Sequence, residues 1–450
     1  MTRHRRIIAT LALFTAAALP IHAQGLRDKF HELFVFGPGG IELFLPGTAD
    51  PSNPASVQLH GKHFIPASVG ANGSLIAFLG NAIAGSAANA PLSAASAGTT
   101  FRFEGGVPVA TSGSSGPLFA ERAQTLGRGR VFAGFNRNHA HYESLRGVPM
   151  NDIRLIFTHQ NVTPADVPDC NATAGGDCNL MGVPKLENDI MMFDLKLNVD
   201  VTVTSLFLTY GLTDRLDLSF AVPIVSASLR GTSDAELVPF GGPPVVHFFA
   251  GTADQPVLHA SQAVDGSATG VGDVAARIKW NVSHSARTGF AMLLDARFPT
   301  GSEEDLLGTG HFAARALAIV SSQFGDFTPH ANVGVLLRTG KTENDAMLAT
   351  LGFDHRMAPW ATLAVDLISE FQIGANKFNL PTTVTYDAPF RRTVEPSSIP
   401  GMRDNLINGS FGLKFKTIGE VTGVANAIIP LNRGGLRPNM LWTFGIEYSF

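Results

Sequence analysis

The chain has 450 residues and a formal net charge of −4, with 16% charged and 45% apolar residues. A net charge this small argues against nucleic acid as a partner and against a strongly acidic surface. Beyond the N-terminal region, no apolar run is long enough to cross a bilayer as a helix. An apolar composition without such a run predicts apolar residues in alternation, as on lipid-facing β-strands.

Residues 1–23 are predicted to form a secretory signal peptide. Arg3, Arg5 and Arg6 make a positive n-region, residues 7–19 form an apolar run, and Ala23 offers a small residue for cleavage. The apolar run is shorter than the roughly 20 residues that a transmembrane helix needs. We therefore expect an exported mature protein without a transmembrane helix.

Residues 24–127 are rich in Pro, Gly, Asn and Ala and show little periodicity. We expect an irregular, partly helical N-terminal segment that lies in the lumen of a barrel or on its periplasmic side. A small periplasmic domain or a disordered leader fits the same composition, and the sequence does not decide between these alternatives.

From residue 128 to residue 450 the pattern becomes a regular two-residue alternation. The clearest case is LKLNVDVTVT at 195–204, where apolar and polar side chains alternate over about the length of a tilted membrane-crossing strand. A parallel-sheet enzyme would instead show continuous apolar runs separated by helices. We predict twelve strands, near residues 129–142, 189–210, 216–230, 271–283, 289–299, 311–323, 327–339, 349–357, 360–374, 406–417, 421–431 and 440–450.

The connections between these strands alternate between brief turns and longer loops, as they do in outer-membrane barrels. The longer loops are expected at 143–188, 231–270, 300–310, 340–348, 375–405 and 432–439. An even number of strands places both ends of the barrel on the periplasmic side. Because every backbone group in hydrocarbon needs a protein partner, the sheet must close on itself. The predicted fold is therefore an all-β, antiparallel, up-and-down transmembrane β-barrel.

Charged side chains on these strands are expected to point inward. An Arg or Lys that faces lipid at mid-depth costs about 2–4 kcal/mol, so the charges should line the lumen opposite the apolar residues. The candidate lumen-lining residues are Asp200, Asp273, Arg277, Lys279, Asp295, Arg297, Arg315, Asp366, Glu370, Lys414 and Lys416.

The last ten residues, LWTFGIEYSF, alternate apolar and mostly polar or small side chains and end on an aromatic residue. This stretch resembles the terminal strand of bacterial outer-membrane barrels, in which the last aromatic residue serves as an assembly signal. The resemblance implies that Trp442, Phe444, Tyr448 and Phe450 are recognised by the barrel-assembly machinery. The last strand of a soluble sandwich is the alternative.

The two cysteines, Cys170 and Cys178, lie in a loop-like segment and are predicted to form a disulfide in an oxidising compartment. The sequence indicates no metal site and no cofactor. His139 and His141 are two residues apart in the sequence. Such a pair at the end of a strand is more often a pair of surface residues at the barrel rim than a metal site. Nucleophilic catalysis would require a Ser, Asp or Glu together with a His that a third group holds in place. The sequence around the histidines indicates no such arrangement, so we do not expect an enzyme.

Three short motifs carry a family resemblance. They are YGLTDRLD at 210–217 with Pro223 following, GVGD at 270–273 and FPTG at 298–301. In this order and spacing, the chain resembles the outer-membrane channel family named for the meta-pathway of phenol degradation. That resemblance implies a transporter for aromatic or other hydrophobic compounds. Each motif by itself is better explained as a turn or a strand end than as a binding site.

We therefore predict a monomeric channel in the outer membrane of a Gram-negative bacterium. It would take up small hydrophobic or aromatic solutes passively, with lipid, the assembly machinery and the solute as its partners. The alternative is a structural or adhesion barrel with a sealed lumen, whose long external loops at 143–188, 231–270 and 375–405 bind a partner.

Overall fold

The computed structural model describes residues 25–37, 40, 42–43, 45, 47–48, 101–104, 107–110, 115–117, 119–158, 189–239, 245, 247–285, 287–377, 380, 383–386, 392–417 and 421–450. The predicted signal peptide and both cysteines, Cys170 and Cys178, lie outside these residues, so the predictions made for them stay predictions.

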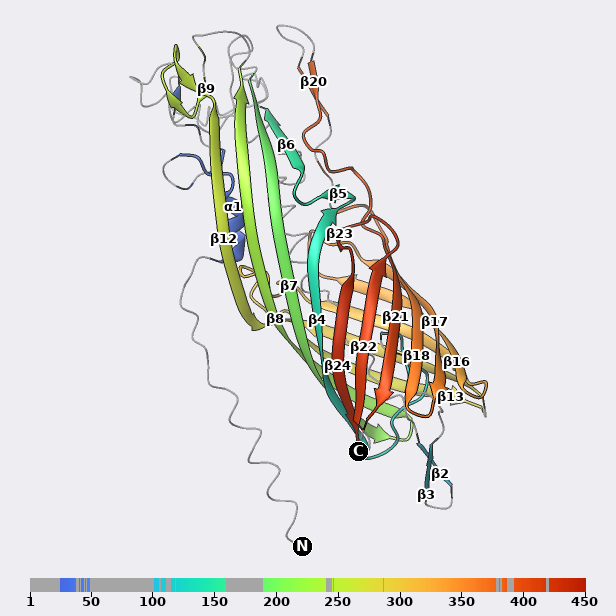
Figure 1. Ribbon diagram of the computed structural model, residues 1–450. Coiled ribbons are helices and arrows are strands. Elements are labelled where there is room, and N and C mark those ends of the chain that lie inside the picture. Colours follow the sequence, from blue (N-terminus) through green and yellow to red (C-terminus); the bar gives the residue numbers. More distant parts are fainter. Residues whose placement is uncertain are drawn as a thin grey trace, which may run out of the picture.

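Within the described residues, twelve long antiparallel strands form a closed barrel (Figure 1). The ring closes where β24 pairs with β4, so the predicted fold and number of strands are confirmed. In order round the barrel the strands are β4 (Val131–Leu145), β7 (Ile190–Thr213), β8 (Leu216–Val238), β13 (Val274–His284), β14 (Thr288–Phe298), β15 (Ala313–Ser322), β16 (Phe327–Arg338), β17 (Ala346–Ala358), β18 (Ala361–Gln372), β21 (Leu406–Lys416), β22 (Val421–Pro430) and β24 (Leu441–Ser449).

The two ends of the barrel differ in their connections. At one end β7 and β8 are joined through Asp214 and Arg215, and β17 and β18 through Pro359 and Trp360. The C-terminus lies at this end (Figure 1). We call it the periplasmic end, because outer-membrane barrels have short periplasmic turns and longer external loops. The opposite end is called extracellular.

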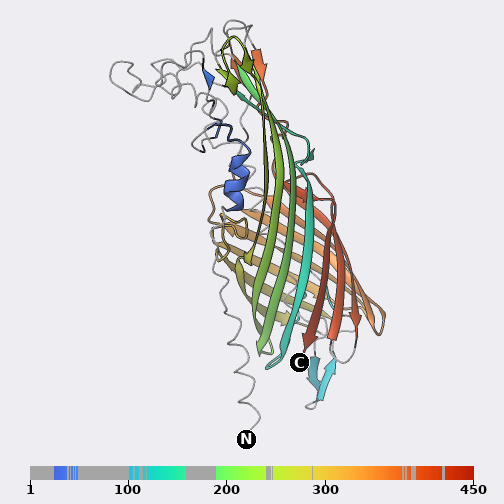
Figure 2. The ribbon, with the colours of Figure 1, turned by 60° about the vertical axis from the view of Figure 1, so that its left-hand side comes forward.

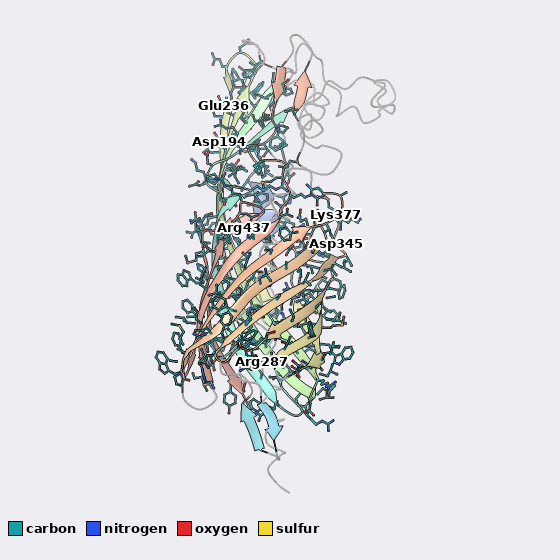
Figure 3. All side chains as sticks on the ribbon, turned by 90° about the vertical axis from the view of Figure 1, so that its right-hand side faces the viewer. Asp194, Glu236, Arg287, Asp345, Lys377 and Arg437 are labelled. Atoms are coloured by element: carbon teal, nitrogen blue, oxygen red, sulfur yellow. The ribbon has the colours of Figure 1, made fainter. Side chains whose placement is uncertain are left out.

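The outer wall of the barrel is a band of exposed apolar side chains. Trp280 is 50% exposed and Phe444 is 56% exposed, whereas the alternate residue Thr443 is fully buried. The four predicted assembly residues, Trp442, Phe444, Tyr448 and Phe450, all lie on this outer wall; their recognition by assembly machinery stays a prediction. In Figure 3 the charged residues Asp345 and Lys377 lie at the extracellular end of the barrel.

Strands β7 and β8 continue well past the extracellular rim of the barrel. There β6 (Ile153–Thr158) pairs with β7, and β12 (His259–Val271) pairs with β8. These four strands make a sheet, which we call the extension, that rises away from the end where the C-terminus lies (Figures 1 and 2). The predicted loop 231–270 was therefore wrong in part, since it contains the end of β8 and nearly all of β12. The predicted strand 271–283 breaks at Gly272 and Asp273, between β12 and β13.

The polarity of β7 inverts along its length. Towards the periplasmic end, Leu206 and Leu208 stand exposed on the outer wall. Further towards the extracellular end, the same outward face carries Lys196 and Asn198. The apolar residues that alternate with them, such as Leu197, are buried on the inner face. The interpretation of residues 195–204 as a lipid-facing strand was therefore wrong. Above the membrane the outside is water, so the apolar face turns inward as in a soluble protein.

A short helix, α1 (Leu26–Glu32), covers the inner, apolar face of the extension (Figure 2). Leu26, Phe30, Leu33 and Phe34 join a buried cluster with apolar residues of β7, β8 and β12. The backbone N–H of Arg27 donates to the carbonyl of Glu304 at 2.9 Å, which ties α1 to the loop between β14 and β15. The helix α1 and the sheet of the extension thus form a small two-layer structure, with α1 on the inner side.

The remaining described strands are short. They are β1 (Gly47–Thr48), β2 (Phe101–Glu104), β3 (Val107–Ala110), β5 (Val148–Pro149), β9 (His247–Phe248), β10 (Ala250–Gly251), β11 (Pro256–Val257), β19 (Val384–Tyr386), β20 (Arg392–Val394) and β23 (Leu436–Pro438). No helix in the described part of the chain is both long and apolar enough to cross a membrane.

Candidate functional site

Residues 115–117 and 119–126, which we call the lumen segment, run inside the barrel. Their backbone is irregular, and its polar groups bond to inward-facing side chains of the strands, as buried backbone must. Near the periplasmic end, the strand positions involved come from β8, β13, β15, β16 and β18. The contacts are Ser115 N to Thr362 Oγ1 (2.9 Å), Glu121 N to Asn332 Oδ1 (2.8 Å), Asn332 Nδ2 to Glu121 O (2.9 Å), Ala123 N to Ser321 Oγ (3.0 Å), Asn281 Nδ2 to Ala123 O (2.7 Å) and Leu126 N to Asp217 Oδ2 (3.0 Å).

Two buried ion pairs fix the centre of the lumen segment. The guanidinium of Arg122 binds the carboxylate of Asp354 through two nitrogens, with Nε 2.9 Å from Oδ1. The ammonium of Lys279 lies 3.4 Å from Oε2 of Glu121. Because removing one partner of a buried pair leaves an uncompensated charge, these contacts make the position of the segment specific.

The chain leaves the lumen at the turn between β7 and β8. The N–H of Arg128 donates to Asp214 at 3.2 Å, and the N–H of Gly129 donates to the carbonyl of Gly211 at 2.8 Å. A Cβ on Gly211 would lie 1.9 Å from the carbonyl oxygen of Gly127, so only glycine allows this approach. The crossing joins the lumen segment to the start of β4.

A cavity of ≈ 190 Å³ lies in the lumen on the extracellular side of the lumen segment. Phe119 and Glu121 form its floor. On β16, Asn332 binds the lumen segment. Leu336, four residues further from the periplasmic turn, lines the cavity. Its apolar wall consists of Leu317, Leu336, Leu348, Ile368, Leu406 and Ile428.

The opposite wall of the cavity is charged and comes from β14 and β15. Asp295, which is almost completely buried, binds the guanidinium groups of Arg277 and Arg315; the Arg315 contact is 2.9 Å long. Arg297 lies two residues further along β14 on the same inward face and also lines the cavity. Three guanidinium groups thus surround one carboxylate. The other two acidic residues of the lining have their own cations, since Glu370 binds Arg338 at 2.7 Å and Glu121 faces Lys279.

Most of the predicted lumen residues lie on the inner face of the barrel, although their role in solute passage stays a prediction. Arg277, Asp295, Arg297 and Arg315 form the charged wall, and Lys279 contacts the lumen segment. Elsewhere in the lumen, His330 Nε2 lies 2.7 Å from Asp366, and Lys414 Nζ lies 2.9 Å from Glu447. Glu370 lines the cavity.

Three predicted residues do not lie deep in the lumen. Asp273 lies at the extracellular rim, where it accepts hydrogen bonds from loop backbone. Asp200 is on the outward face of the extension, where its carboxylate accepts a hydrogen bond from His141 at 2.8 Å. Its assignment to the lumen was wrong for the reason given for β7: above the membrane the polar face of the strand turns outward. Lys416 is exposed at the periplasmic end of β21, next to the turn.

The residues of the lumen segment that contact the barrel wall were missed by the sequence argument. Phe119, Glu121 and Arg122 lie in a stretch with no strand periodicity, and Asp354 binds Arg122 from 232 residues further along the chain. The one usable signal was charge: Glu121 and Arg122 are adjacent ionisable residues in an otherwise weakly charged segment. Their partners are more than 150 residues away, which local patterns cannot reveal.

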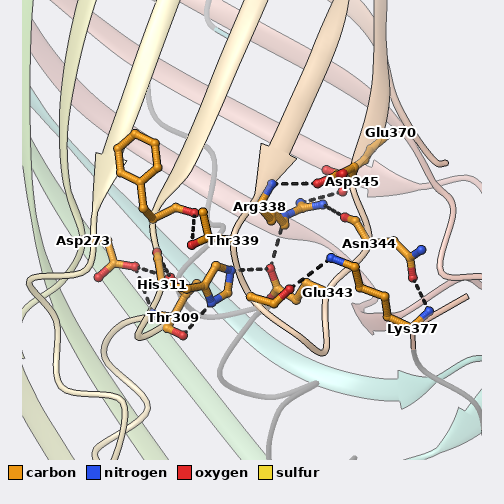
Figure 4. Close-up of polar contacts among 12 residues, drawn as sticks. Asp273, Thr309, His311, Arg338, Thr339, Glu343, Asn344, Asp345, Glu370 and Lys377 are labelled. Carbon is orange, nitrogen blue, oxygen red and sulfur yellow. Dashed lines mark hydrogen bonds and ion pairs between the residues drawn. The ribbon is translucent and has the colours of Figure 1, made fainter. Parts of the chain in front are cut away.

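A polar network ties together the loops at the extracellular rim (Figure 4). Nε2 of His311 lies 3.3 Å from Glu343, and Glu343 lies 3.2 Å from Nε of Arg338. The Glu343 carboxylate raises the pKa of His311 above its ordinary value, against the opposing effects of partial burial and of Arg338. Asn344 accepts a hydrogen bond from the N–H of Lys377 at 3.0 Å, which joins this loop to the loop after β18.

The two histidines considered for a metal lie on the outer face of β4. Nδ1 of His139 contacts Thr202 at 3.1 Å, and His141 faces Asp200. Within the described ranges, no group of three or more His, Cys, Asp or Glu side chains is arranged to hold a metal ion.

The comparisons with known proteins agree with this architecture. Residues 189–385 match the family model described as "Putative MetA-pathway of phenol degradation". The family resemblance predicted from the three motifs is confirmed. The matched part runs from β7 into the region after β18. No curated protein matches the chain.

Several solved outer-membrane proteins are similar in structure. An outer membrane channel from Pseudomonas putida F1 shares 13% identity over 73% of this chain and 98% of that chain, with a TM-score of 0.40. The P. putida toluene transporter TodX shares 9% identity over 71% of this chain and 89% of that chain, with a TM-score of 0.29. A FadL homologue of Pseudomonas aeruginosa shares 10% identity with the same coverage and the same TM-score as TodX.

The three motifs now have a structural explanation. GVGD and FPTG interlock at the extracellular rim, where Asp273 accepts hydrogen bonds from Gly301 N at 3.1 Å and from Thr309 N at 2.9 Å. Thr300 Oγ1 donates to the carbonyl of Gly272 at 2.6 Å. These contacts stabilise the break between β12 and β13. The third motif supplies Asp214 and Asp217, which bind the chain where it leaves the lumen.

Proposed function

We propose that this protein is an outer-membrane channel for the passive uptake of small hydrophobic or aromatic compounds. The observation that carries the proposal is the cavity in the lumen, which has one apolar wall and lies directly on the extracellular side of the lumen segment. A barrel with a purely structural role would not need a cavity with an apolar wall above the lumen segment. The family match to a phenol-degradation model supports the same class of solute.

The route to this cavity would begin at the extension. Its inner face is apolar from Phe193 downward, and the buried cluster continues through Val203 to Ile428 and Leu441 of the barrel proper. Ile428 also lines the cavity. An apolar solute gains free energy by leaving water for such a surface, at about 25 cal/mol per Å² of apolar area. We infer that this face guides solutes into the barrel and that α1 moves aside as they enter.

The lumen segment would act as the gate. In the closed state the Arg122–Asp354 and Lys279–Glu121 pairs anchor it across the periplasmic half of the lumen. Its displacement would connect the cavity with the periplasm, and solute would then follow its concentration gradient. No cofactor and no chemical step are needed.

The remaining parts of the proposal concern location and assembly. We propose that the chain is exported through a cleaved signal peptide, is inserted by the barrel-assembly machinery and works as a monomer. The exposed aromatic residues of β24 are positioned on the lipid-facing wall, where such machinery could bind them.

The gate can be tested with the double variant Arg122→Gln and Asp354→Asn. Replacing both charged partners avoids leaving one of them uncompensated while removing the anchor. We expect low conductance in planar bilayers for the wild type and more frequent, larger openings for the variant. Liposomes carrying the variant should also take up toluene or phenol faster.

The matched control is Lys416→Gln, which removes a charge from the exposed periplasmic end of β21 without touching the lumen segment. It should conduct like the wild type. If the double variant folds, yet neither it nor the wild type conducts or passes any aromatic solute, the transport proposal is wrong. The sealed barrel with partner-binding external loops would then be the better description.

A further inference from the structure

We propose that His330 sets the strength of the gate's anchor by binding or releasing one proton. This inference rests on the proposed gate, in which Arg122 and Asp354 hold the lumen segment, and it assigns a regulation to that gate. His330 is a positioning residue, because it acts on the lumen segment through Asp354. The inference is carried by the place of each ring nitrogen of a buried imidazole between two buried carboxylates.

One ring nitrogen of His330 binds a carboxylate two strands away. His330 on β16, Gly352 on β17 and Asp366 on β18 pair in one row across the sheet. Nε2 of His330 lies 2.7 Å from Oδ1 of Asp366. A Cβ on Gly352 would lie 2.1 Å from that oxygen and 2.8 Å from Nε2, so a glycine here lets the two side chains meet.

The other ring nitrogen faces the anchor of the lumen segment. Nδ1 of His330 lies 3.7 Å from Oδ1 of Asp354. The same oxygen accepts a hydrogen bond from Nε of Arg122 at 2.9 Å. Within the described residues, Nδ1 of His330 makes no hydrogen bond of its own. A proton on Nδ1 would therefore lie next to the oxygen that holds the lumen segment.

Burial gives each proton of the imidazole a distinct effect. The side chains of His330, Asp354 and Asp366 are 0% or 1% exposed, and an uncompensated charge in such a place is costly. In the described part of the chain, His330 is the one hydrogen-bond and ion-pair partner of the Asp366 carboxylate. The first proton therefore stays between these two groups. The second proton, on Nδ1, changes the charge beside Asp354.

The direction of the effect follows from these charges. With one proton on the ring the imidazole is neutral, and the carboxylate of Asp354 attracts Arg122 without competition from it. A second proton makes the imidazole positive, so that it attracts Oδ1 of Asp354 and repels the guanidinium of Arg122. Imidazoles are the side chains that change charge between about pH 5 and 8. Acidification in this range should therefore weaken the anchor and release the lumen segment.

The remaining charged groups can be separated from His330. On β15 the residue opposite His330 is Ser321, which does not titrate in this range. Glu121 and Lys279 form their own ion pair on the lumen segment, and His311 lies at the extracellular rim. All three keep their charges when His330 is replaced. A pH response that arises from any of them would survive that replacement.

The test is the pH dependence of single-channel openings of the full-length protein in planar bilayers, with the same pH in both chambers. For the wild type we expect an open probability at about pH 5.5 that is at least fivefold higher than at about pH 7.5. His330→Gln keeps an amide that can donate to Asp366 but gains no second proton, so its open probability should stay low at both pH values. A wild type without this response, or a response of wild-type size in folded His330→Gln protein, would overturn the proposal.

Two further variants sharpen the test. His355→Gln removes an exposed histidine of β17 and should respond like the wild type, whereas a lost response there would contradict the assignment to His330. Asp366→Asn removes the negative charge that favours the positive imidazole, so its open probability at about pH 5.5 should be at least threefold below that of the wild type. Each variant is first checked for folding by its heat-dependent shift in gel mobility. If His330→Gln does not fold, wild-type opening of Asp366→Asn overturns the proposal instead.

Failure of this inference can be told apart from failure of the channel proposal. The Arg122→Gln and Asp354→Asn double variant lacks the ion pair on which His330 acts, so it should open frequently at both pH values. If it conducts and passes aromatic solutes while the wild type shows no pH dependence, only the inference about His330 is wrong. If neither protein conducts or passes an aromatic solute at any pH, the channel proposal itself fails.

Discussion

At the scale of single residues, the charges in this protein act in pairs that join distant parts of the chain. Arg122 and Asp354 bind the lumen segment to β17, and Arg338 links Glu343 to Glu370 at the rim. Each buried pair costs desolvation energy, so its main effect is to specify one arrangement rather than to add stability. In this barrel the arrangement so specified holds the lumen segment beneath the cavity.

The rim pair of His311 and Glu343 should make stability depend on pH. Glu343 raises the pKa of His311, so the contribution of the pair is fully present below the unfolded imidazole pKa of about 6.5. It is lost as the pH rises through the higher folded value. We expect His311→Asn to lower the midpoint of thermal unfolding in detergent more at about pH 5.5 than at about pH 8.5.

The comparison uses the difference between the variant and the wild type at each pH. The pair of His31 and Glu42 also titrates, but it is present in both proteins and cancels in that difference. A gap of equal size at both pH values would show that His311 contributes no pH dependence.

At the scale of elements, β7 is built from two segments with opposite polarity. Its periplasmic part has lipid outside and a polar lumen inside, whereas its extracellular part has water outside and α1 inside. Both parts keep the same two-residue alternation, and no register shift separates Thr204 from Leu206. The inversion therefore marks where the surrounding solvent changes from lipid to water.

This boundary can be tested with the same substitution on either side of it. Leu208→Arg places a charge on the lipid-facing wall and should destabilise the barrel by about 2–4 kcal/mol. Asn198→Arg places the same charge on the same face above the membrane and should change stability little. Urea unfolding in lipid vesicles measures both, and similar losses for the two variants would contradict the assigned boundary.

At the scale of the whole molecule, the seam that closes the barrel between β24 and β4 runs to the last residue. Val131 N donates to the carbonyl of Phe450 at 2.8 Å, and Phe450 N donates to the carbonyl of Val131 at 2.9 Å. The backbone pairing of the seam thus extends to the chain terminus. A closed barrel leaves no strand edge with unpaired backbone groups. Closure is required in the hydrocarbon core of a membrane, because no water is present there to hydrogen-bond such an edge.

If the terminal aromatic residue is also an assembly signal, its loss should matter in cells more than in vitro. We expect Phe450→Ala to lower the amount of folded protein in the outer membrane several-fold, while refolding of the purified variant into detergent proceeds normally. Phe411→Ala, an outward aromatic on β21, is the control and should assemble normally. Equal assembly of both variants would exclude Phe450 as a signal.

The sequence by itself determined the strands, their number and their closure. Alternation with a period of two is a local property, and in hydrocarbon the backbone requires that such strands close on themselves. It also placed Arg277, Asp295 and Arg315 correctly on the inner face, because charges cannot face lipid. The alternation could not say whether the apolar face of β7 points outward or inward, since that depends on the depth at which the strand lies.

Only the tertiary structure decided what fills the lumen. The lumen segment has no periodicity of its own, and its position follows from partners such as Asn332 and Asp354, more than 200 residues further along the chain. The cavity likewise is lined by side chains from seven strands together with Phe119 and Glu121 of the lumen segment. Such a site arises from long-range packing and charge pairing, for which neighbouring residues in the sequence provide no pattern.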